Sequence, residues 1–214
     1  MEFIKNEDKI EIKKLLDSKL TNDVNIIIFT SKDKSKCMYC KEAVALLKEL
    51  SVLNSKLKVT EYDVVENLKE AKFMGIDKVP AIILGGKTIY NLYYFGIPTG
   101  YEFASLIEDI IDVSTGQTRL SDATKKALKK FNNPIDIKIF VTPTCPWCPK
   151  AVRTAHQFSI ENNKIKSSMI EATEFPELSQ NYGVMAVPKI IINDKESFEG
   201  AQPEEVFLKY LSNI

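Results

Sequence analysis

The chain of 214 residues contains two halves that match one another when one is shifted by 108 positions. Each half carries two cysteines three residues apart and, further on, a Val-Pro step. The first cysteine and the proline are 43 residues apart in both halves. A repeat of this length indicates two duplicated domains rather than a solenoid of short units. The matched pairs are Cys37 with Cys145, Cys40 with Cys148, Val79 with Val187, and Pro80 with Pro188.

Each half carries the same predicted order of elements around its cysteine pair. A run rich in β-branched residues predicts a strand before the cysteines, and apolar residues at i, i+4 and i+7 predict a helix that begins at them. A second strand and a short helix follow, and the Val-Pro step then opens an apolar strand. Gly85-Gly86 and Asn193-Asp194 predict hairpin turns into a fourth strand. The strands around the cysteines are predicted at residues 24–30, 57–64, 135–141 and 165–172.

Helices are predicted at both ends of each half. Ser121 is the predicted cap of the second lead helix. Thr99 and Glu102 form a capping box at the start of the first closing helix, and Pro203 suits the first position of the last helix. The apolar face of the first lead helix is predicted to consist of Ile12, Leu15, Leu16 and Leu20.

The predicted fold is two tandem α/β domains, residues 1–115 and 116–214, each with a mixed central sheet flanked by helices. The polar segment 114–119 is the predicted linker. With 44% hydrophobic residues the chain can build its cores without disulfides as staples. Four cysteines are also few for a stapled secreted protein, and the chain is long for that class.

Composition excludes several classes of function. Lysine plus arginine equals aspartate plus glutamate, 29 each, which argues against a nucleic-acid partner. The first 20 residues lack the apolar segment of a signal peptide, and no run is long enough to span a membrane. We therefore expect a cytoplasmic protein. In that compartment paired cysteines are more often catalytic, redox-sensing or metal-binding than structural.

The first cysteine of each pair is a predicted nucleophile. At a helix N-terminus the first backbone N–H groups are unpaired and the dipole is positive, so a thiolate is stabilised. Cysteine pKa values fall there from about 8.5 to roughly 3.5–7.5. Cys37 and Cys145 are the expected attacking sulfurs, while Cys40 and Cys148 can displace the captured substrate. The sulfur pairs carry the electrons themselves, so no bound cofactor is required.

The residues around the two cysteine pairs differ. Pro146 suits a first helical position and removes one N–H that could stabilise a thiolate, whereas Met38 keeps that N–H. Pro149 is expected to loosen the first turn, because it cannot donate to the carbonyl of Cys145. We therefore predict that the two centres have different reduction potentials. The sequence pattern does not tell which of the two is higher.

The two Val-Pro steps are expected to bind substrate. Proline lacks a donor for the sheet ladder, and the equal spacing behind both cysteine pairs favours a cis bond at Pro80 and Pro188. The backbone of Val79 and Val187 would then be free to pair with an extended peptide.

Three side chains beside the sulfurs are candidates for a role in the exchange. Tyr39 and Trp147 lie between the cysteines, where they cannot be deep in the core, and should present a flat apolar surface to substrate. Lys36 precedes Cys37 and would lower its pKa if it lay close, although a solvated lysine is the expected arrangement.

Three titratable residues are candidates for acid–base roles. His156, the only histidine, lies eleven residues past Cys145, about three turns along the helix, so a structural role is expected. Asp63 and Glu171 end equivalent strands. Either could accept the proton of a second cysteine, but a position at the surface end of a strand is the expected one.

Together these motifs resemble a known family. A C-x-x-C at a helix start after a strand, with a Val-Pro step 43 residues on, is similar to the thioredoxin and glutaredoxin fold. Two fused copies, with TPTCPWCPKAV and YGVMAVPKI in the second, resemble the protein disulfide oxidoreductases of thermophilic archaea and bacteria. The resemblance covers essentially the whole chain and is strongest from Leu120 onward. The first half departs from it at Met38 and in the segment TSKDKSK.

The resemblance implies two thioredoxin-like domains in a thiol–disulfide oxidoreductase that reduces, oxidises or isomerises the disulfides of protein substrates. Cys145 would be the principal nucleophile, resolved by Cys148, and Cys37 with Cys40 would form a second centre. A flavin-dependent reductase of the thioredoxin-reductase type would supply electrons.

Other functions remain open on the sequence. The chain could be a glutathione-dependent glutaredoxin, a dedicated electron donor to a peroxidase, or a metal-binding or chaperone-like module. Four sulfurs suit zinc, but structural zinc sites usually bring their ligand pairs within a few dozen residues. Here 104 residues separate Cys40 from Cys145, so no metal is expected.

Overall fold

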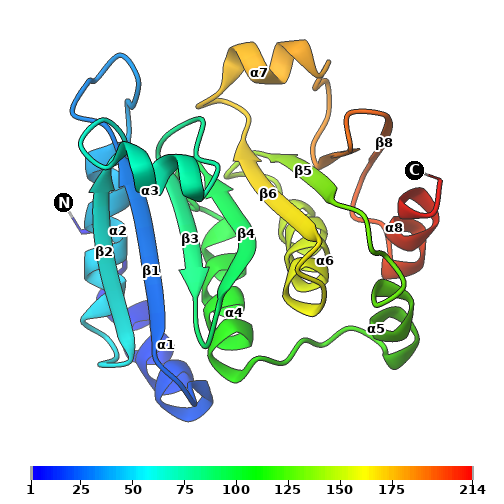
Figure 1. The fold of residues 1–214 in the computed structure, drawn as a ribbon. Coiled ribbons are helices and arrows are strands. Elements are labelled where there is room, and N and C mark those ends of the chain that lie inside the picture. The colour runs from blue at the N-terminus through cyan, green and yellow to red at the C-terminus, as the bar shows by residue number, and fades with distance from the viewer. Residues whose placement is uncertain (1, 214) are drawn as a thin grey trace.

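A computed structural model describes residues 2–213 and has one eight-stranded sheet at its centre, with helices on both faces (Figure 1). The first half contains α1 (Asn6–Lys19), β1 (Val24–Thr30), α2 (Cys40–Ser51), β2 (Leu57–Asp63), α3 (Leu68–Phe73), β3 (Ala81–Gly85), β4 (Ile89–Phe95) and α4 (Glu102–Thr115). The second half contains α5 (Asp122–Leu128), β5 (Ile135–Val141), α6 (Cys148–Glu161), β6 (Ile165–Glu171), α7 (Pro176–Asn181), β7 (Lys189–Ile192), β8 (Glu196–Glu199) and α8 (Glu204–Leu211).

The sheets predicted for the two halves are joined into one. The strand order is β2-β1-β3-β4-β6-β5-β7-β8, and the join is a parallel pair between residues 92–95 of β4 and 167–170 of β6. Strands β1, β2, β4, β5 and β6 all run in one direction, and β3 and β7 run against them. Pairing β4 with β6 satisfies backbone groups that two separate sheets would leave as open edges.

Two layers of helices cover the sheet. Helices α2, α4 and α6 lie behind it in Figure 1, while α3 and α7 lie on the opposite face. The larger core, behind the sheet, contains the buried faces of α2 and α6, including Leu47 and Phe158. The smaller core lies on the sheet face that α3 and α7 cover, and it contains Phe29 and Phe95.

Most local predictions agree with the structure. The strands around the cysteines lie where they were expected, and the Ser121 hydroxyl accepts a hydrogen bond from the Thr124 N–H at 3.2 Å. Asn193 and Asp194 both have positive φ, as a two-residue hairpin turn requires. Three details are wrong here, and those at the active site are described below. Gly85 is the last residue of β3 and pairs with Ile89, so Gly85-Gly86 is not the turn itself. Leu15 is 40% exposed, so it lies outside the buried face of α1, and Pro203 precedes α8 instead of opening it.

A buried polar network joins α4 of the first half to α6 of the second. Asp109, which is fully buried, contacts the Tyr94 hydroxyl, the Arg153 guanidinium and, at 2.6 Å, Nδ1 of His156. Arg153 also pairs with Asp112. Burial, and secondarily the charge of Arg153, lowers the pKa of His156 to about 3, so the imidazole is neutral and its Nδ1–H donates a hydrogen bond to the Asp109 carboxylate.

Both cysteine pairs lie at the same edge of the sheet, which we call the active edge: the edge at the carboxyl ends of β1 and β5. Each pair follows one of these parallel strands. The Val-Pro steps also lie there, because they precede β3 and β7, which run in the opposite direction. Four strand spacings separate β1 from β5, so the two pairs are about 20 Å apart along the sheet.

Candidate active site

The cysteines sit at the starts of α2 and α6, as predicted. Each helix begins at the second cysteine, and the first cysteine lies in the turn before it. Cys37 is disulfide-bonded to Cys40 and Cys145 to Cys148, with 5.5 Å between the two Cα atoms in each pair. This Cα separation is the usual one for a disulfide.

In the second centre the two sulfurs differ in their hydrogen bonds and in their exposure. The backbone N–H of Cys148 donates a hydrogen bond to Sγ of Cys145 at 3.1 Å. Cys145 is 7% exposed whereas Cys148 is fully buried, so only Cys145 can be reached by a substrate. The Val187 carbonyl oxygen lies 3.7 Å from Sγ of Cys145, which places the Val-Pro step against the nucleophile.

The first centre is arranged differently. Among the residues described, the N–H of Cys40 makes no hydrogen bond to Cys37; instead Sγ of Cys40 accepts one from the Ser31 N–H at 3.4 Å. The segment TSKDKSK forms a turn in which Asp33 accepts a hydrogen bond from Ser35 N–H at 2.9 Å. A polar hollow of ≈ 510 Å³ opens beside Cys40, so water can reach its sulfur region.

Both Val-Pro bonds are cis, which confirms the predicted geometry of Pro80 and Pro188. The N–H groups of Val79 and Val187 form no hydrogen bond within residues 2–213. These donors therefore remain available to an extended peptide that docks beside either cysteine pair.

The aromatic residues between the sulfurs lie at the surface, as expected. Trp147 is 68% exposed and Tyr39 is 41% exposed. Met38 next to Tyr39 is 76% exposed, so an apolar surface borders each pair. Pro146 does not hold the predicted first helical position, because α6 begins only at Cys148 and it is Pro149 that lies in the first helical turn.

Glu102 is a site residue that the sequence assigns wrongly. No side-chain cap is present at the start of α4, where Thr99 and Glu102 were expected to form a capping box. Gly100 instead has φ of +61°, and the Tyr101 N–H donates to the carbonyl of Pro143, two residues before Cys145. This turn directs Glu102 inward, where it is 1% exposed and neither carboxyl oxygen has a hydrogen-bond partner among the residues described.

The register of α4 and α6 places Glu102 at about the level of the second cysteine pair along the two helices. Asp109 meets His156, and Glu102 and Cys148 lie seven and eight residues before them, about 10–12 Å back along each helix. Residues at i and i+7 share a helix face, so Glu102 faces α6 as Asp109 does. Burial raises the pKa of Glu102 to about 7. A carboxyl group with this pKa can accept and return a proton near neutrality.

The other titratable candidates have structural positions. Backbone N–H groups, that of Val65 above all, hold the pKa of Asp63 below its usual range, so it is a turn-forming carboxylate. Glu171 is 2% exposed, so its expected surface position is wrong: Gly96, which follows β4 of the first half, lies against its side chain. His156 lies inside the network of Asp109, away from both sulfur pairs, in line with the expected structural role.

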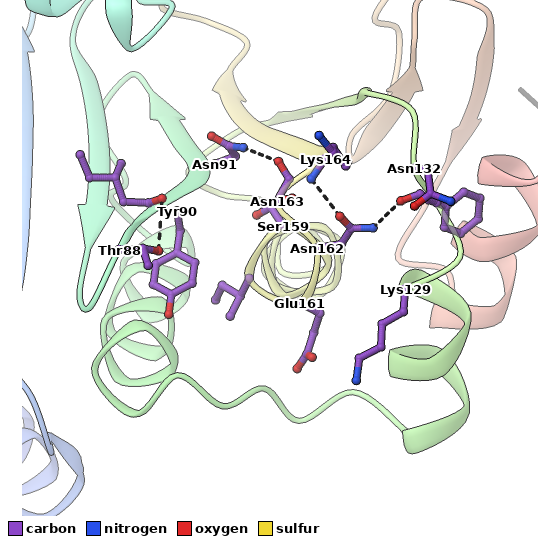
Figure 2. A pocket seen from close by; sticks show the side chains of 13 residues that line it. Thr88, Tyr90, Asn91, Lys129, Asn132, Ser159, Glu161, Asn162, Asn163 and Lys164 are labelled. Atoms are coloured by element: carbon purple, nitrogen blue, oxygen red, sulfur yellow. Dashed lines mark hydrogen bonds between the residues drawn. The ribbon is translucent and has the colours of Figure 1, made fainter.

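A second hollow, of ≈ 500 Å³, lies between the halves at the edge opposite the active edge (Figure 2). Its asparagines are engaged within the protein: the Asn91 amide donates to the Asn163 carbonyl at 2.8 Å, and that of Asn162 to the Leu128 carbonyl at 2.7 Å. Because it is a strand length from both cysteine pairs, this hollow does not belong to the active site.

Across residues 2–213, histidine, cysteine and acidic side chains nowhere gather in threes as a metal site would need. None of the helices in that range combines the length and apolar character needed to cross a bilayer.

Comparison with known proteins identifies the family. The glutaredoxin family model matches residues 26–89, and a thioredoxin domain model matches residues 135–213. The protein disulfide oxidoreductase from Aeropyrum pernix k1 is 32% identical, with a TM-score of 0.90 over 98% of this chain and 92% of that chain. The chain belongs to the protein disulfide oxidoreductase family. As a family member it is a thiol–disulfide oxidoreductase with one C-x-x-C centre in each of two thioredoxin-like domains.

Longer relatives share this protein disulfide oxidoreductase architecture. The alkyl hydroperoxide reductase AhpF of Staphylococcus aureus is 28% identical over 205 residues, which is 96% of this chain but 37% of that protein. The chain thus spans little more than a third of the curated relatives it matches. The NTD_N/C domain of alkylhydroperoxide reductase AhpF from Enterococcus faecalis shares the fold, with a TM-score of 0.87 over 96% of this chain and 98% of that chain at 22% identity.

Proposed function

We propose that the chain exchanges thiols and disulfides with extended segments of protein substrates, and that Cys145 is the principal nucleophile. The observation that carries this proposal is the arrangement at the start of α6: an accessible sulfur that accepts a helix N–H, beside the unpaired N–H of Val187. Tyr39 and Trp147 would contact the substrate as apolar surfaces. Val79 and Pro80 are assigned the same role at the first centre as Val187 and Pro188 at the second.

In the reducing direction the reaction has two steps. The Cys145 thiolate attacks one sulfur of the substrate disulfide, which forms a mixed disulfide and releases the other sulfur as a thiolate. Cys148 then attacks Cys145, the Cys145–Cys148 disulfide forms, and the second substrate sulfur leaves. Two electrons pass to the substrate, and each departing sulfur takes up one proton. Oxidation is the same sequence reversed.

Glu102 is the proposed proton acceptor for Cys148. Cys148 is fully buried and must lose its proton before it can attack. The Cys148 side chain has no exposed surface, and Glu102 is a buried carboxyl on the neighbouring helix α4 at about the same level. At the first centre the polar hollow beside Cys40 lets water take that role, so the two centres differ in their proton route.

The proposed cellular setting follows the family. Electrons would come from a flavin-dependent reductase of the thioredoxin-reductase type, and the reaction would take place in the cytoplasm. A second candidate function is electron transfer within alkyl hydroperoxide reduction. It is supported by the match of nearly the whole chain to part of the alkyl hydroperoxide reductase AhpF.

The test is reduction of a disulfide-containing model protein by four full-length variants, each with one cysteine changed to serine. Cys145→Ser should abolish most turnover, and Cys148→Ser should accumulate a mixed disulfide that mass spectrometry locates on Cys145. Cys37→Ser should lose part of the activity. Full activity of the Cys37→Ser, Cys145→Ser double variant would end the proposal.

The second candidate has a separate test. The reduced chain is mixed with a cysteine-based peroxidase and cumene hydroperoxide, and its reoxidation is compared with that by the model protein. Reoxidation at least tenfold faster by the peroxidase would favour the hydroperoxide pathway, and equal or slower reoxidation would remove it. Dependence of turnover on added glutathione in either assay would instead support the glutaredoxin alternative.

A further inference from the structure

A groove next to the first centre has apolar walls and a lysine rim. We call it the lysine groove; its volume is ≈ 620 Å³. Its walls include Val65 and Leu68, which are 66% and 52% exposed, and Phe175 closes one side. Lys36 and Lys72 stand at its rim.

The lysine groove reaches the residues next to the first cysteine pair and its cis proline. Lys36 immediately precedes Cys37, and Val79, which precedes the cis proline, lines the groove. Neither the N–H nor the C=O of Val79 is hydrogen-bonded within residues 2–213. A peptide strand that pairs with Val79 would therefore lay its neighbouring side chains into the groove.

The rim of the groove carries a positive charge that the protein does not neutralise. Lys36 and Lys72 are both exposed, and within residues 2–213 neither has a carboxylate within salt-bridge distance. The third lysine of the groove, Lys78, is paired with Asp77 at 2.5 Å. Two unpaired lysines beside the apolar walls of the lysine groove complement a peptide segment that carries acidic side chains and one apolar side chain.

The second centre lacks this charge. The 108-residue shift places Thr144, Gln180 and Ala186 at the positions of the three lysines, and Met185 at that of Asp77. Met185 is 92% exposed, and Trp147 on the same centre is 68% exposed. At these equivalent positions the second cysteine pair has neutral side chains where the first has lysines.

The groove also depends on the joining of the two halves. Phe175 belongs to the connection between β6 and α7, which the β4–β6 pair brings next to the first half. The second half has no such neighbour, because its fourth strand, β8, is at the end of the sheet. The two centres therefore differ in shape as well as in charge.

We propose that the first centre selects an extended protein segment with acidic residues and one large apolar residue beside its cysteine, while the second centre accepts neutral and apolar segments. This inference rests on the proposed exchange function of Cys37 and Cys40. In the reaction, Cys37 attacks the segment's disulfide and releases one thiolate. Cys40 then displaces the segment, and two electrons have passed from the Cys37–Cys40 pair to the substrate.

The test uses full-length protein in which Cys145 and Cys148 are changed to serine, so that only the first centre reacts. The variant is reduced, freed of reductant and mixed with an excess of a peptide disulfide. The reaction is stopped with acid and the peptide dithiol is quantified. Three peptides share a core with one leucine next to the cysteine and carry glutamate, glutamine or lysine flanks. The small neutral disulfide 2-hydroxyethyl disulfide reports on the chemistry alone.

The glutamate peptide should react about tenfold faster than the lysine peptide at low salt, since each unpaired lysine contributes up to about fivefold through an exposed ion pair. The ratio should fall to about twofold in 0.5 M salt, where the charges are screened. In the double variant Lys36→Gln, Lys72→Gln the ratio of the glutamate to the lysine peptide rate should be about twofold at any salt concentration. Lys195→Gln, which changes an exposed lysine of the β7–β8 turn, is the matched control and should keep the tenfold ratio.

The possible failures are distinguishable. If 2-hydroxyethyl disulfide does not react, the first centre is inactive and the proposed function fails there. If it reacts but the glutamate and lysine peptides differ by less than twofold, or the double lysine variant keeps the tenfold ratio, the selection inference is wrong. A second measurement avoids the serine background: Cys40→Ser in the otherwise unaltered chain should trap the glutamate peptide on Cys37 in preference to the lysine peptide, as read by mass spectrometry.

Discussion

Glu102→Gln is expected to raise the free energy of unfolding of the oxidised protein at pH 8 and to leave it nearly unchanged at pH 4. The Glu102 carboxyl is 1% exposed, and burial raises its pKa from 4.5 to about 7. At about 1.4 kcal/mol per pH unit, that difference corresponds to about 3 kcal/mol of lost stability when the group is fully ionised.

The sign follows from the protons bound in each state. Well below pH 4.5 the carboxyl is protonated in both folded and unfolded chains, so it adds no pH dependence. Between pH 4.5 and about 7 the unfolded chain releases the proton and the folded chain keeps it, so the free energy of unfolding falls as the pH rises. Above pH 7 the loss stays constant. Glutamine at this position removes the whole dependence.

The assay is guanidinium unfolding of oxidised wild type and variant at pH 4, 6 and 8, followed by the fluorescence of Trp147 and by circular dichroism. The gap between variant and wild type should open by about 3 kcal/mol from pH 4 to pH 8. Glu177→Gln, the same change at an exposed position in α7, should show no such gap. Parallel pH dependence in wild type and Glu102→Gln would refute the assignment of a raised pKa to this carboxyl.

Glu102→Gln should also slow the release of substrate from Cys145 at the second centre. In a chain whose first centre is removed by Cys37→Ser and Cys40→Ser, release of a captured substrate from Cys145 should accelerate as the pH rises through about 7, where Glu102 becomes able to accept a proton. Adding Glu102→Gln should abolish this inflection and slow release at least about tenfold above it, within the usual range for loss of a general base. A more stable but slower enzyme would identify Glu102 as functional rather than structural.

Three further predictions concern the packing and the two centres. Gly100→Ala should cost about 3 kcal/mol or more in denaturant unfolding, because its Cβ would lie 2.1 Å from the Pro143 carbonyl oxygen; Gly75→Ala, with the same positive φ but no atom within 4 Å, should cost only about 1. Asp109→Asn should destabilise the protein by about 3–5 kcal/mol in the same assay, since it leaves Arg153 buried with less compensation, and a loss below 1 kcal/mol would contradict the network. Reduction potentials measured in full-length protein with one centre removed at a time should differ between the centres, and equal values would contradict the effect assigned to the residues around each pair.

Local elements and the sulfur chemistry could be predicted from the sequence because each is encoded by residues close together in the chain. The cysteine pairs, the strands before them and the cis bonds at Pro80 and Pro188 repeat at one fixed shift. That repetition doubles the evidence for each motif. The division into domains at residues 115 and 116, and the roles of the individual site residues, stay predictions.

Two of the misassigned residues, Glu102 and Glu171, share a cause: each faces the other half of the molecule. Thr99 and Glu102 fit a capping box by residue type, but the backbone of Pro143 takes the Tyr101 N–H and Glu102 turns toward α6. Glu171 ends a strand that would be an edge strand in a lone domain, and Gly96 of the first half lies against its side chain. A repeat reports what each copy can fold into and contains no signal for how the copies dock.

The placement of both sulfur pairs on one continuous sheet limits how electrons can circulate within the molecule. Disulfide interchange requires sulfur atoms in direct contact, and a gap of about 20 Å spanned by hydrogen-bonded strands cannot close by bending. A dithiol at one end therefore cannot regenerate its counterpart directly. Electron transfer between the two centres therefore needs a diffusible protein, a substrate or a donor, that exchanges disulfides first with one centre and then with the other.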